Sequence, residues 1–282
     1  MKIYIIYFFI IFFTVGSSAQ QKVIIKLWPG AVPGETEAKH EPVKTDNTSG
    51  NVTRITDITD PAMIVFPAAE DNNNGSGIVV CPGGGYNILA IDKEGYEIAE
   101  WLNKLGFTAA VLQYRVPQKQ EGALQDVQRA IRIIRSRAEK WNLDPNKLGV
   151  MGFSAGGSLS ARASTLYNNE TYSRLDEKDT ISCRPDFALL IYPAYLDQGE
   201  NRSITPELKV DSDTPPSFIF QTADDRLGNS ALVYAGALRD ANVPIELHLL
   251  PKGGHGYGMR PGNPAAETWP ELAEKWLNIY AK

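Results

Sequence analysis

The sequence predicts an α/β fold in which helices cover both faces of a mostly parallel sheet. From Gly77 onward, apolar segments of strand length alternate with segments of helical periodicity, a pattern typical of parallel strands joined by helical crossovers. The pentapeptide Gly-Phe-Ser-Ala-Gly at 152–156 follows one such strand and precedes one such helix, as expected for a sharp strand-to-helix turn. The chain of 282 residues has no internal repeats and no convincing linker, so a single domain is predicted over 20–282.

Hydrophobic periodicity assigns the individual elements. Strands are predicted, in chain order, at 23–27, 53–58, 62–67, 77–81, 107–114, 147–151, 186–192, 217–221 and 244–250. Helices are predicted at 94–105, 123–141, 157–167, 229–241 and 268–280. The polar turn at 72–76 separates the first three strands from the alternating part of the chain.

The first 19 residues are predicted to be a signal peptide. Lys2 supplies a positive charge, residues 3–15 form an almost unbroken apolar run, and small residues at 16–19 form a cleavage region. The apolar run is short for a bilayer span, which requires roughly 20 residues. An N-terminal anchor that stays uncleaved is the alternative. Cleavage after Ala19 predicts a secreted or periplasmic protein with no membrane span.

A run of three glycines, 83–85, follows the apolar strand at 77–81. Consecutive glycines expose backbone N–H groups, which stabilise an oxyanion that develops during acyl transfer. Gly84 and Gly85 are therefore candidate oxyanion donors, together with Ala155. A phosphate-binding loop is the alternative interpretation, but no Gly-Lys-Ser/Thr follows and the G-x-G-x-x-G spacing is absent.

Ser154 is the candidate nucleophile. In a G-x-S-x-G turn the flanking glycines are required because a Cβ would clash where the backbone reverses. Such a turn exposes the serine Oγ and directs the N–H of Ala155 toward the oxyanion. A glycine-rich turn that merely contains a serine is the alternative. The buried strand at 147–151 and the helix at 157–167 favour the nucleophile.

A serine hydroxyl needs a base, which is normally a histidine. The chain has three histidines. His40 lies in the polar N-terminal region, and His248 falls on the alternating strand at 244–250, where a position on a sheet face is expected. His255 lies in a glycine-rich loop directly after that strand. We therefore expect His255 to be the base.

The carboxylate that orients the histidine is expected after the strand at 217–221, where Asp224 and Asp225 are adjacent. We assign Asp225 to this role because it lies nearer the following helix. Asp224 is then a turn or capping residue, a common use of aspartate in loops. The choice between the two aspartates stays open at this point.

These motifs resemble the esterase/lipase branch of the α/β hydrolases. The likeness is carried, in order, by CPGGGY, KEGYEIAEWLNKLGF, VLQYRVP, LQDVQRAIRIIRSRAEKW, GFSAGG, RPDFALLIYPAY, TADD and GGHGYGM. With the opening KLWPGAVPGE, they are most similar to secreted carbohydrate esterases of the acetylxylan and feruloyl esterase type. The chain order serine, aspartate, histidine also matches. One departure is Pro82, which stands where the family's glycine loop usually begins with histidine.

The resemblance implies the α/β-hydrolase fold and a serine esterase that acts on acetyl or feruloyl esters of plant-wall polysaccharide such as xylan. The segment at 193–215 is short and polar, so no large lid is expected and a water-soluble ester is favoured. Tyr86 and Tyr257 each follow a glycine loop and are candidates for contact with a sugar. A serine peptidase of the same fold and a non-catalytic carbohydrate-binding module are the alternatives.

Composition excludes several other classes. The formal net charge is −5 and no stretch concentrates Lys and Arg, so no nucleic-acid partner is expected. No cofactor and no metal are predicted, because the histidines are scattered and no cysteine pair has ligand spacing. With only Cys81 and Cys183, a disulfide framework is excluded. Cys81 is expected to pack as a small hydrophobic residue, with a single bridge to Cys183 as the alternative.

Overall fold

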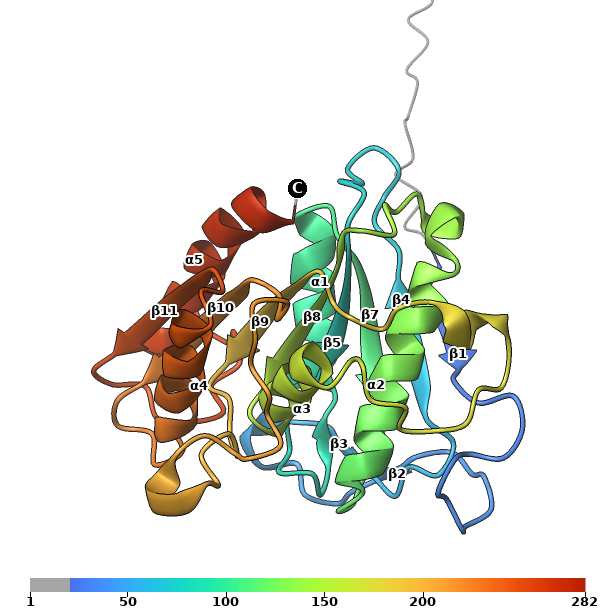
Figure 1. The fold of residues 1–282 in the computed structure, drawn as a ribbon, viewed down its shortest axis with the longest axis horizontal. Coiled ribbons are helices and arrows are strands. Elements are labelled where there is room, and N and C mark those ends of the chain that lie inside the picture. The colour runs from blue at the N-terminus through green and yellow to red at the C-terminus, as the bar shows by residue number, and fades with distance from the viewer. Residues whose placement is uncertain (1–20, 282) are drawn as a thin grey trace, which may run out of the picture.

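A central sheet of eight strands organises the part of the chain that the computed structural model describes, residues 21–281 (Figure 1). The predicted signal peptide, 1–19, lies outside the described residues. The strands are β1 (Val23–Lys26), β4 (Ala62–Phe66), β5 (Gly77–Cys81), β7 (Thr108–Gln113), β8 (Leu148–Phe153), β9 (Phe187–Ile191), β10 (Ser217–Thr222) and β11 (Ile245–Leu250). Their spatial order is β1-β4-β7-β5-β8-β9-β10-β11. The first two pairings are antiparallel, and the six strands from β7 to β11 are parallel.

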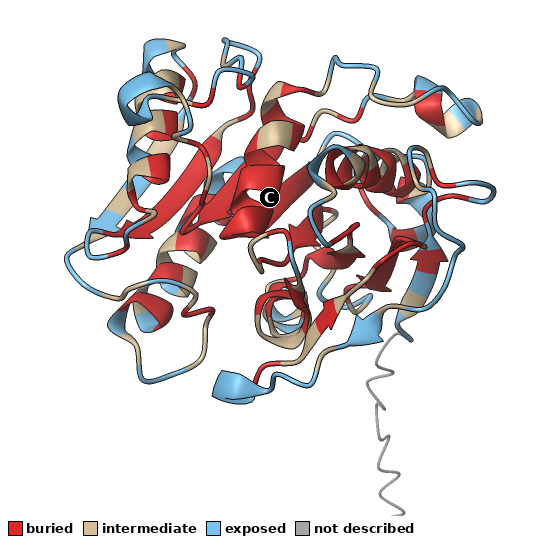
Figure 2. Cartoon of the chain, turned by 90° about the horizontal axis from the view of Figure 1, so that it is seen from below, coloured by how far each residue is buried: buried red, intermediate tan, exposed pale blue. Residues whose placement is uncertain are grey.

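Helices cover both faces of this sheet, as predicted. They are α1 (Glu97–Lys104), α2 (Gln120–Arg135), α3 (Ala155–Thr165), α4 (Asn229–Asp240) and α5 (Pro264–Tyr280). In Figure 1, α2, α3 and α4 lie in front of the sheet, and α1 and α5 lie behind it. Behind the sheet, Trp101 of α1 meets Trp269 of α5 edge to face, with 5.2 Å between the ring centroids. The six inner strands of the sheet lie buried between these two layers, whereas the edge strands β1 and β11 are partly exposed (Figure 2).

Helix boundaries differ from the prediction by a few residues in several places, and most at the end of α2 and the start of α5. The helix expected at 123–141 is wrong as one element, because α2 ends at Arg135 and a 3₁₀ turn, η3 (Ala138–Trp141), follows. The hydroxyl of Ser136 donates to the carbonyl of Ile133 at 2.8 Å, and Arg137 leaves the helical region at φ −120°. The closing helix begins at Pro264 rather than at 268, because the side chain of Asn263 caps its N-terminus.

A second, antiparallel sheet consists of β2 (Val43–Lys44), β3 (Arg54–Thr56) and β6 (Leu89–Ala90). It lies at the lower edge of the molecule in Figure 1. Hydrophobic periodicity predicted a longer strand, 53–58, in place of β3, and it did not predict the two-residue strands β2 and β6. Ala90 pairs with Arg54 and also donates its N–H to the carbonyl of Gly83 at 2.9 Å. The small sheet therefore connects the N-terminal region to the glycine loop.

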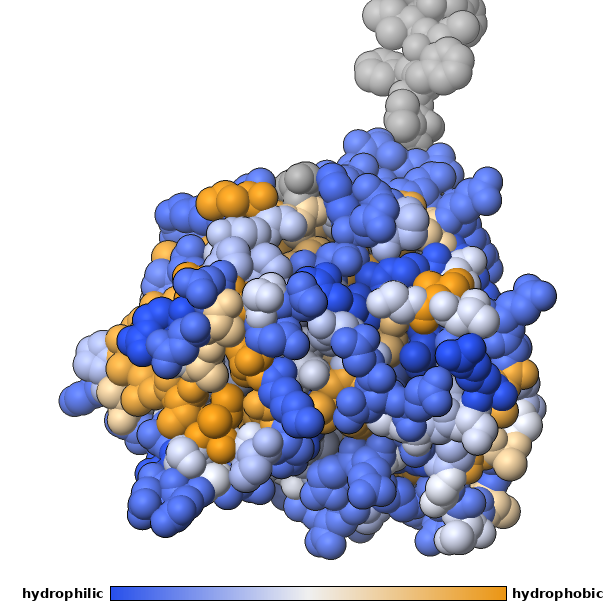
Figure 3. All heavy atoms as spheres, in the orientation of Figure 1, coloured by the Kyte–Doolittle hydropathy of each residue, from blue (hydrophilic) through white to orange (hydrophobic). Residues whose placement is uncertain are grey.

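The surface over α2, α3 and α4 is mostly hydrophilic, with an apolar patch over α4 (Figure 3). Leu232 of α4 is 43 % exposed. The segment at 193–215 contains one short 3₁₀ turn, η5 (Glu200–Arg202), and adds no large lid to the described residues. None of the helices in residues 21–281 combines the length and apolar character needed to cross a bilayer. Cys81 and Cys183 are free and buried, so the alternative disulfide is absent.

Candidate active site

Ser154 occupies a strained backbone turn between β8 and α3. Its φ of 53° and ψ of −118° lie in a region that residues with a side chain rarely adopt. The N–H of Ser154 donates to the carbonyl of Ile191 at 3.1 Å, and its carbonyl accepts from the N–H of Ala194 at 3.1 Å. These bonds to the end of β9 hold the turn at the carboxyl edge of the sheet.

The two glycines that flank Ser154 leave room for this turn. A Cβ on Gly152 would overlap the carbonyl oxygen of Gly156, and one on Gly156 would overlap the carbonyl oxygen of Cys81. The predicted steric need for glycine at both positions is therefore confirmed. The same close approach places α3, which begins at Ala155, against the end of β5.

The structure brings Ser154, His255 and Asp225 into one hydrogen-bonded row. His255 Nε2 lies 2.7 Å from Ser154 Oγ, and His255 Nδ1 lies 2.6 Å from Asp225 Oδ2. Asp225 also accepts the N–H of Leu227 at 2.9 Å, and its side chain is only 3 % exposed, against 29 % for His255. A buried carboxylate at Nδ1 favours the tautomer that leaves Nε2 free to accept the serine proton.

Asp224 makes different contacts. Its two carboxylate oxygens accept the N–H of Gly254 at 2.9 Å and the N–H of Gly253 at 3.3 Å. These backbone bonds, chiefly the one from Gly254, lower the pKa of Asp224. Thr222 Oγ1 donates to the carbonyl of Gly254 at 2.7 Å. Asp224 and Thr222 therefore shape the loop that carries His255, while Asp225 contacts the imidazole itself.

The three candidate oxyanion donors lie near Ser154 with their N–H groups unused. Gly84, Gly85 and Ala155 donate no backbone hydrogen bond to any residue in 21–281. Gly84 has a φ of +141°, and a Cβ there would overlap the carbonyl of Ile88, so this position requires glycine. Ala155 is the first residue of α3, where the N–H groups have no partner within the helix and the helix dipole is positive.

A buried carboxyl group, Glu94, lies behind the glycine loop. Its Oε2 accepts the N–H of Gly83 at 2.8 Å, and its Oε1 accepts the hydroxyl of Tyr192 at 2.8 Å. The Tyr192 oxygen in turn accepts the N–H of Gly258 at 2.9 Å. Glu94 lies in η2 (Asp92–Tyr96), a π-helical turn of the kind often found at functional sites. It links the glycine loop to the histidine loop, and burial raises its pKa.

A cavity of about 350 Å³ opens at Ser154. It is lined by Val52, Arg54, Gly84, Gly85, Ile88, Ala90, Lys93, Glu94, Ser154, Tyr195, Leu227, His255 and Gly256. The sequence identified only four of these residues as candidates. Arg54 and Glu94 were placed on a strand and a helix, and nothing local signalled that long-range packing brings them to the serine.

Neither tyrosine predicted to contact a sugar lines this cavity. Tyr86 is 3 % exposed and packs between Tyr114 and Tyr195, and Tyr257 is 5 % exposed with its ring 4.3 Å from that of Tyr192. The geometry thus corrects that expectation, because both rings support the loops from beneath. Tyr195 is the aromatic residue that reaches the cavity.

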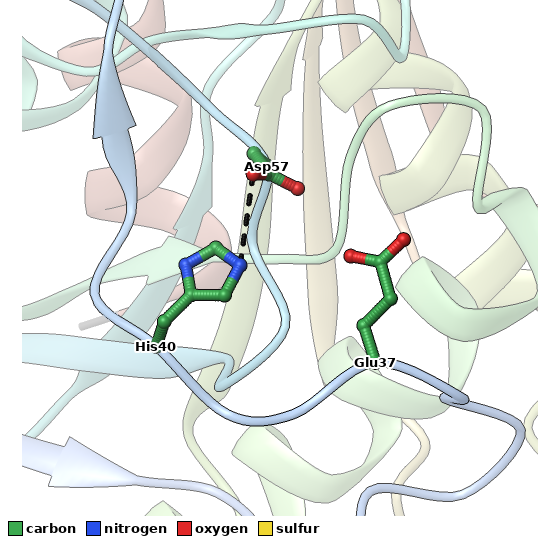
Figure 4. Close-up of side chains that lie close together, drawn as sticks. All are labelled: Glu37, His40 and Asp57. Carbon is green, nitrogen blue, oxygen red and sulfur yellow. Dashed lines mark ion pairs between the residues drawn. The ribbon is translucent and has the colours of Figure 1, made fainter.

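The other two histidines lie apart from this cavity. His248 is on β11, as predicted, with Nε2 2.6 Å from Glu246 Oε1. His40 faces Asp57, with Glu37 across from both (Figure 4), and among residues 21–281 only this trio could bring three ligand atoms within 4.8 Å of one another. His40 and Glu37 are exposed, and none of the three lines the cavity at Ser154.

The parallel sheet and the serine turn after β8 define the chain as an α/β hydrolase. Residues 63–188 match the family model described as BD-FAE. The crystal structure of an acetyl ester-xyloside bifunctional hydrolase from Caldicellulosiruptor lactoaceticus is similar, with 31 % identity and a TM-score of 0.76 over 91 % of this chain and 95 % of that chain. The chain belongs to the carbohydrate esterase branch of the α/β-hydrolase esterases.

Two curated relatives extend the comparison. An acetylxylan esterase from Xylanibacter ruminicola is 35 % identical over 215 residues, which are 67 % of this chain and 42 % of that protein. Endo-1,4-beta-xylanase B from Butyrivibrio fibrisolvens is 32 % identical over 209 residues, which are 64 % of this chain and 32 % of that protein. The match therefore spans less than half the length of either relative.

Glu94→Gln is expected to change how stability depends on pH. Burial holds the folded-state pKa of Glu94 above the unfolded value of 4.5, so between these values the folded chain keeps a proton that the unfolded chain has lost. The wild type should therefore lose stability relative to Glu94→Gln as the pH rises through this window, with a constant difference above it. Urea unfolding at a series of pH values measures this difference.

Glu271→Gln is the matched control for that series. Glu271 is exposed on α5, and its bond to Lys275 lowers its pKa, so the wild type should gain relative stability as the pH rises from the folded-state pKa to the unfolded value of 4.5, with no further change above it. If the free energy of unfolding changed with pH in the same way for the wild type and Glu94→Gln, the raised folded-state pKa of Glu94 would be contradicted.

Proposed function

We propose that this protein is a serine esterase that hydrolyses short acyl esters, chiefly acetyl, on plant-wall polysaccharide such as xylan. The observation that carries the proposal is the 2.7 Å contact between His255 Nε2 and Ser154 Oγ, beside unused backbone N–H groups. The relatives named for acetylxylan esterase and acetyl ester-xyloside hydrolysis support the substrate class. The polar segment at 193–215 supports a water-soluble ester, since a greasy substrate would favour an apolar lid.

Acylation begins when Ser154 Oγ attacks the ester carbonyl while His255 Nε2 takes the hydroxyl proton. Asp225 stabilises the imidazolium that forms and keeps the ring in place. The carbonyl oxygen becomes an oxyanion, which the N–H groups of Gly84, Gly85 and Ala155 would hold. Because those N–H groups have no competing acceptor in residues 21–281, they need no rearrangement before they bind it.

The imidazolium of His255 then protonates the sugar oxygen, which leaves as an alcohol, and an acyl group stays on Ser154. Water enters, His255 removes its proton, and the second tetrahedral intermediate uses the same oxyanion donors. Collapse of that intermediate releases the acid and restores the serine hydroxyl. No metal or other cofactor takes part in these steps.

We infer export from the predicted leader. A positive charge at Lys2, the apolar run at 3–15 and the small residues at 16–19 support a cleaved signal peptide, which would deliver the enzyme to polysaccharide outside the cytoplasm.

Ser154→Ala tests the proposed nucleophile. Removal of the attacking oxygen should lower kcat on acetylated xylo-oligosaccharides by on the order of 10³- to 10⁶-fold, with the fold retained. Acetate release and far-UV circular dichroism measure the two expectations. An alanine variant that keeps more than about a tenth of the activity would exclude Ser154 from the covalent step.

The paired aspartates allow an internal comparison. Asp225→Asn removes the charge that stabilises the imidazolium and should lower kcat by roughly 10²- to 10⁴-fold. Asp224→Asn weakens the bonds from Gly253 and Gly254 and leaves the contact between Asp225 and His255 in place, so thermal stability should change more than kcat. Steady-state kinetics on both variants measures the loss of kcat. A larger loss in Asp224→Asn than in Asp225→Asn would assign the orienting role to Asp224.

Acyl length tests the substrate class. The cavity at Ser154 has a volume of only about 350 Å³, and no apolar lid in residues 21–281 extends it. Acetyl esters should therefore exceed butyryl esters in kcat/KM by at least about tenfold, since each unhoused methylene is worth roughly 1–3 kcal/mol. A matched series of acyl esters on one carrier measures this. Faster release of ferulate than of acetate from matched oligosaccharides would instead indicate a feruloyl esterase.

A further inference from the structure

Two cationic side chains, Arg54 and Lys93, line the cavity that contains Ser154. Both are half-buried. Neither forms an ion pair with any carboxylate in residues 21–281. Unpaired cations in a partly enclosed cavity attract anions more strongly than cations on an open surface, because screening by water and salt is weaker there.

Both side chains are held in place but keep free donors. Arg54 Nη1 donates to the carbonyls of Asn47 at 2.9 Å and Val52 at 3.1 Å, and Nη2 donates to the carbonyl of Ser49 at 3.0 Å. A guanidinium group has five N–H donors, and the two that do not bond to these carbonyls are one on Nε and one on Nη2. Lys93 Nζ donates to the carbonyl of Gly256 at 2.6 Å, which leaves two ammonium N–H groups. Carbonyl acceptors fix the positions of these cations without neutralising their charge.

Neighbouring carboxyl groups balance this charge only in part, because Glu94 and Glu97 act on Lys93 without forming an ion pair with it. Glu97 and Asp92 are bound to Arg260, with Nη2 to oxygen distances of 2.5 Å and 3.4 Å. Glu94 is buried on bonds from Gly83 and Tyr192, and its raised pKa disfavours the ionised form. Burial also lowers the pKa of Lys93, as expected for an ammonium group with little water around it.

The opposite side of His255 has a different electrostatic character. A second cavity there shares Leu227 and His255 with the first, and its charged lining consists of two acidic side chains and one basic side chain, Asp224, Asp225 and Arg226. The excess positive charge is therefore confined to the side of Arg54 and Lys93, although the chain as a whole has a net charge of −5. This asymmetry gives a bound ester a preferred orientation.

We propose, on the basis of the proposed esterase function, that Arg54 and Lys93 bind a carboxylate of the substrate, so that the preferred esters lie on oligosaccharides that carry a uronic acid. The free N–H groups on Nε and Nη2 of Arg54 match the two oxygens of a carboxylate, and Lys93 adds a point charge. Arg54 and Lys93 are thus specificity determinants, separate from the residues that perform the acyl transfer.

The test uses two substrates that differ only in charge. An acetylated xylo-oligosaccharide that bears a glucuronic acid is compared with the same compound after its carboxyl group has been reduced to the neutral alcohol. At low ionic strength the wild type should favour the acidic substrate by about tenfold in kcat/KM, and the preference should shrink in about 1 M salt. Equal rates on the two substrates, or a faster rate on the neutral one, would overturn the proposal.

Two variants assign the preference to these side chains. Arg54→Gln and Lys93→Gln should each reduce the ratio of the two kcat/KM values to about threefold or less, and the double variant should bring it close to one. The ratio cancels any general loss of activity, for example from the broken contact between Lys93 and Gly256. Lys275→Gln removes one exposed charge from α5 and should leave the ratio unchanged. A ratio that stays the same in both cavity variants contradicts the assignment.

Binding provides a readout that does not depend on turnover. Calorimetry with Ser154→Ala should show tighter binding of the acidic oligosaccharide than of its reduced counterpart by about tenfold at low salt. Hydrolysis of both substrates at equal rates would leave the esterase intact and refute only the carboxylate site. Tighter binding of the acidic compound without hydrolysis by the wild type would instead refute the esterase and support the carboxylate site.

Discussion

The backbone turn at Ser154 is the constraint on which the site depends. A serine at φ 53° costs free energy of order 1–3 kcal/mol, so the surrounding structure has to hold it there. The bonds to Ile191 and Ala194 supply part of that hold, and the absence of a Cβ on Gly152 and Gly156 removes the steric obstacle. Because β8 runs directly into α3 through this turn, the hydroxyl and the positive end of the helix dipole meet at one point.

The two loops that complete the site are linked to each other as well as to the serine. Glu94 and Tyr192 connect Gly83 to Gly258 through three hydrogen bonds, and Lys93 bonds to the carbonyl of Gly256. A displacement of the glycine loop therefore disturbs the histidine loop, so the candidate oxyanion donors and His255 keep fixed positions relative to each other. Lys93 and Glu94, two successive residues of the π-helical turn η2, make these contacts, so this irregular turn positions side chains that bond to both loops.

The sequence alone predicted those residues of the site that belong to short, recognisable motifs. Ser154, His255 and the glycine loop each follow a strand that hydrophobic periodicity detects. Because the carboxyl ends of parallel strands lie at the same edge of the sheet, these residues are brought close together. The sequence could not decide between Asp224 and Asp225, because the backbone conformation of the loop determines which of the two adjacent carboxylates reaches His255. Arg54 was beyond local reasoning because β3 reaches the cavity only by pairing with β6, a two-residue strand too short for periodicity to detect.

The tyrosines illustrate a related physical distinction. A residue that directly follows a glycine loop is close to the site along the chain, but the side of the loop on which it lies depends on backbone torsions. Tyr86 adopts φ 57° and turns into the core against Tyr114, whereas Tyr195, about 40 residues beyond the serine turn, reaches the cavity. Several residues that line the cavity therefore come from segments that packing assembles around the motifs. Such segments differ among proteins with the same acyl-transfer residues, and this allows one fold to select different esters.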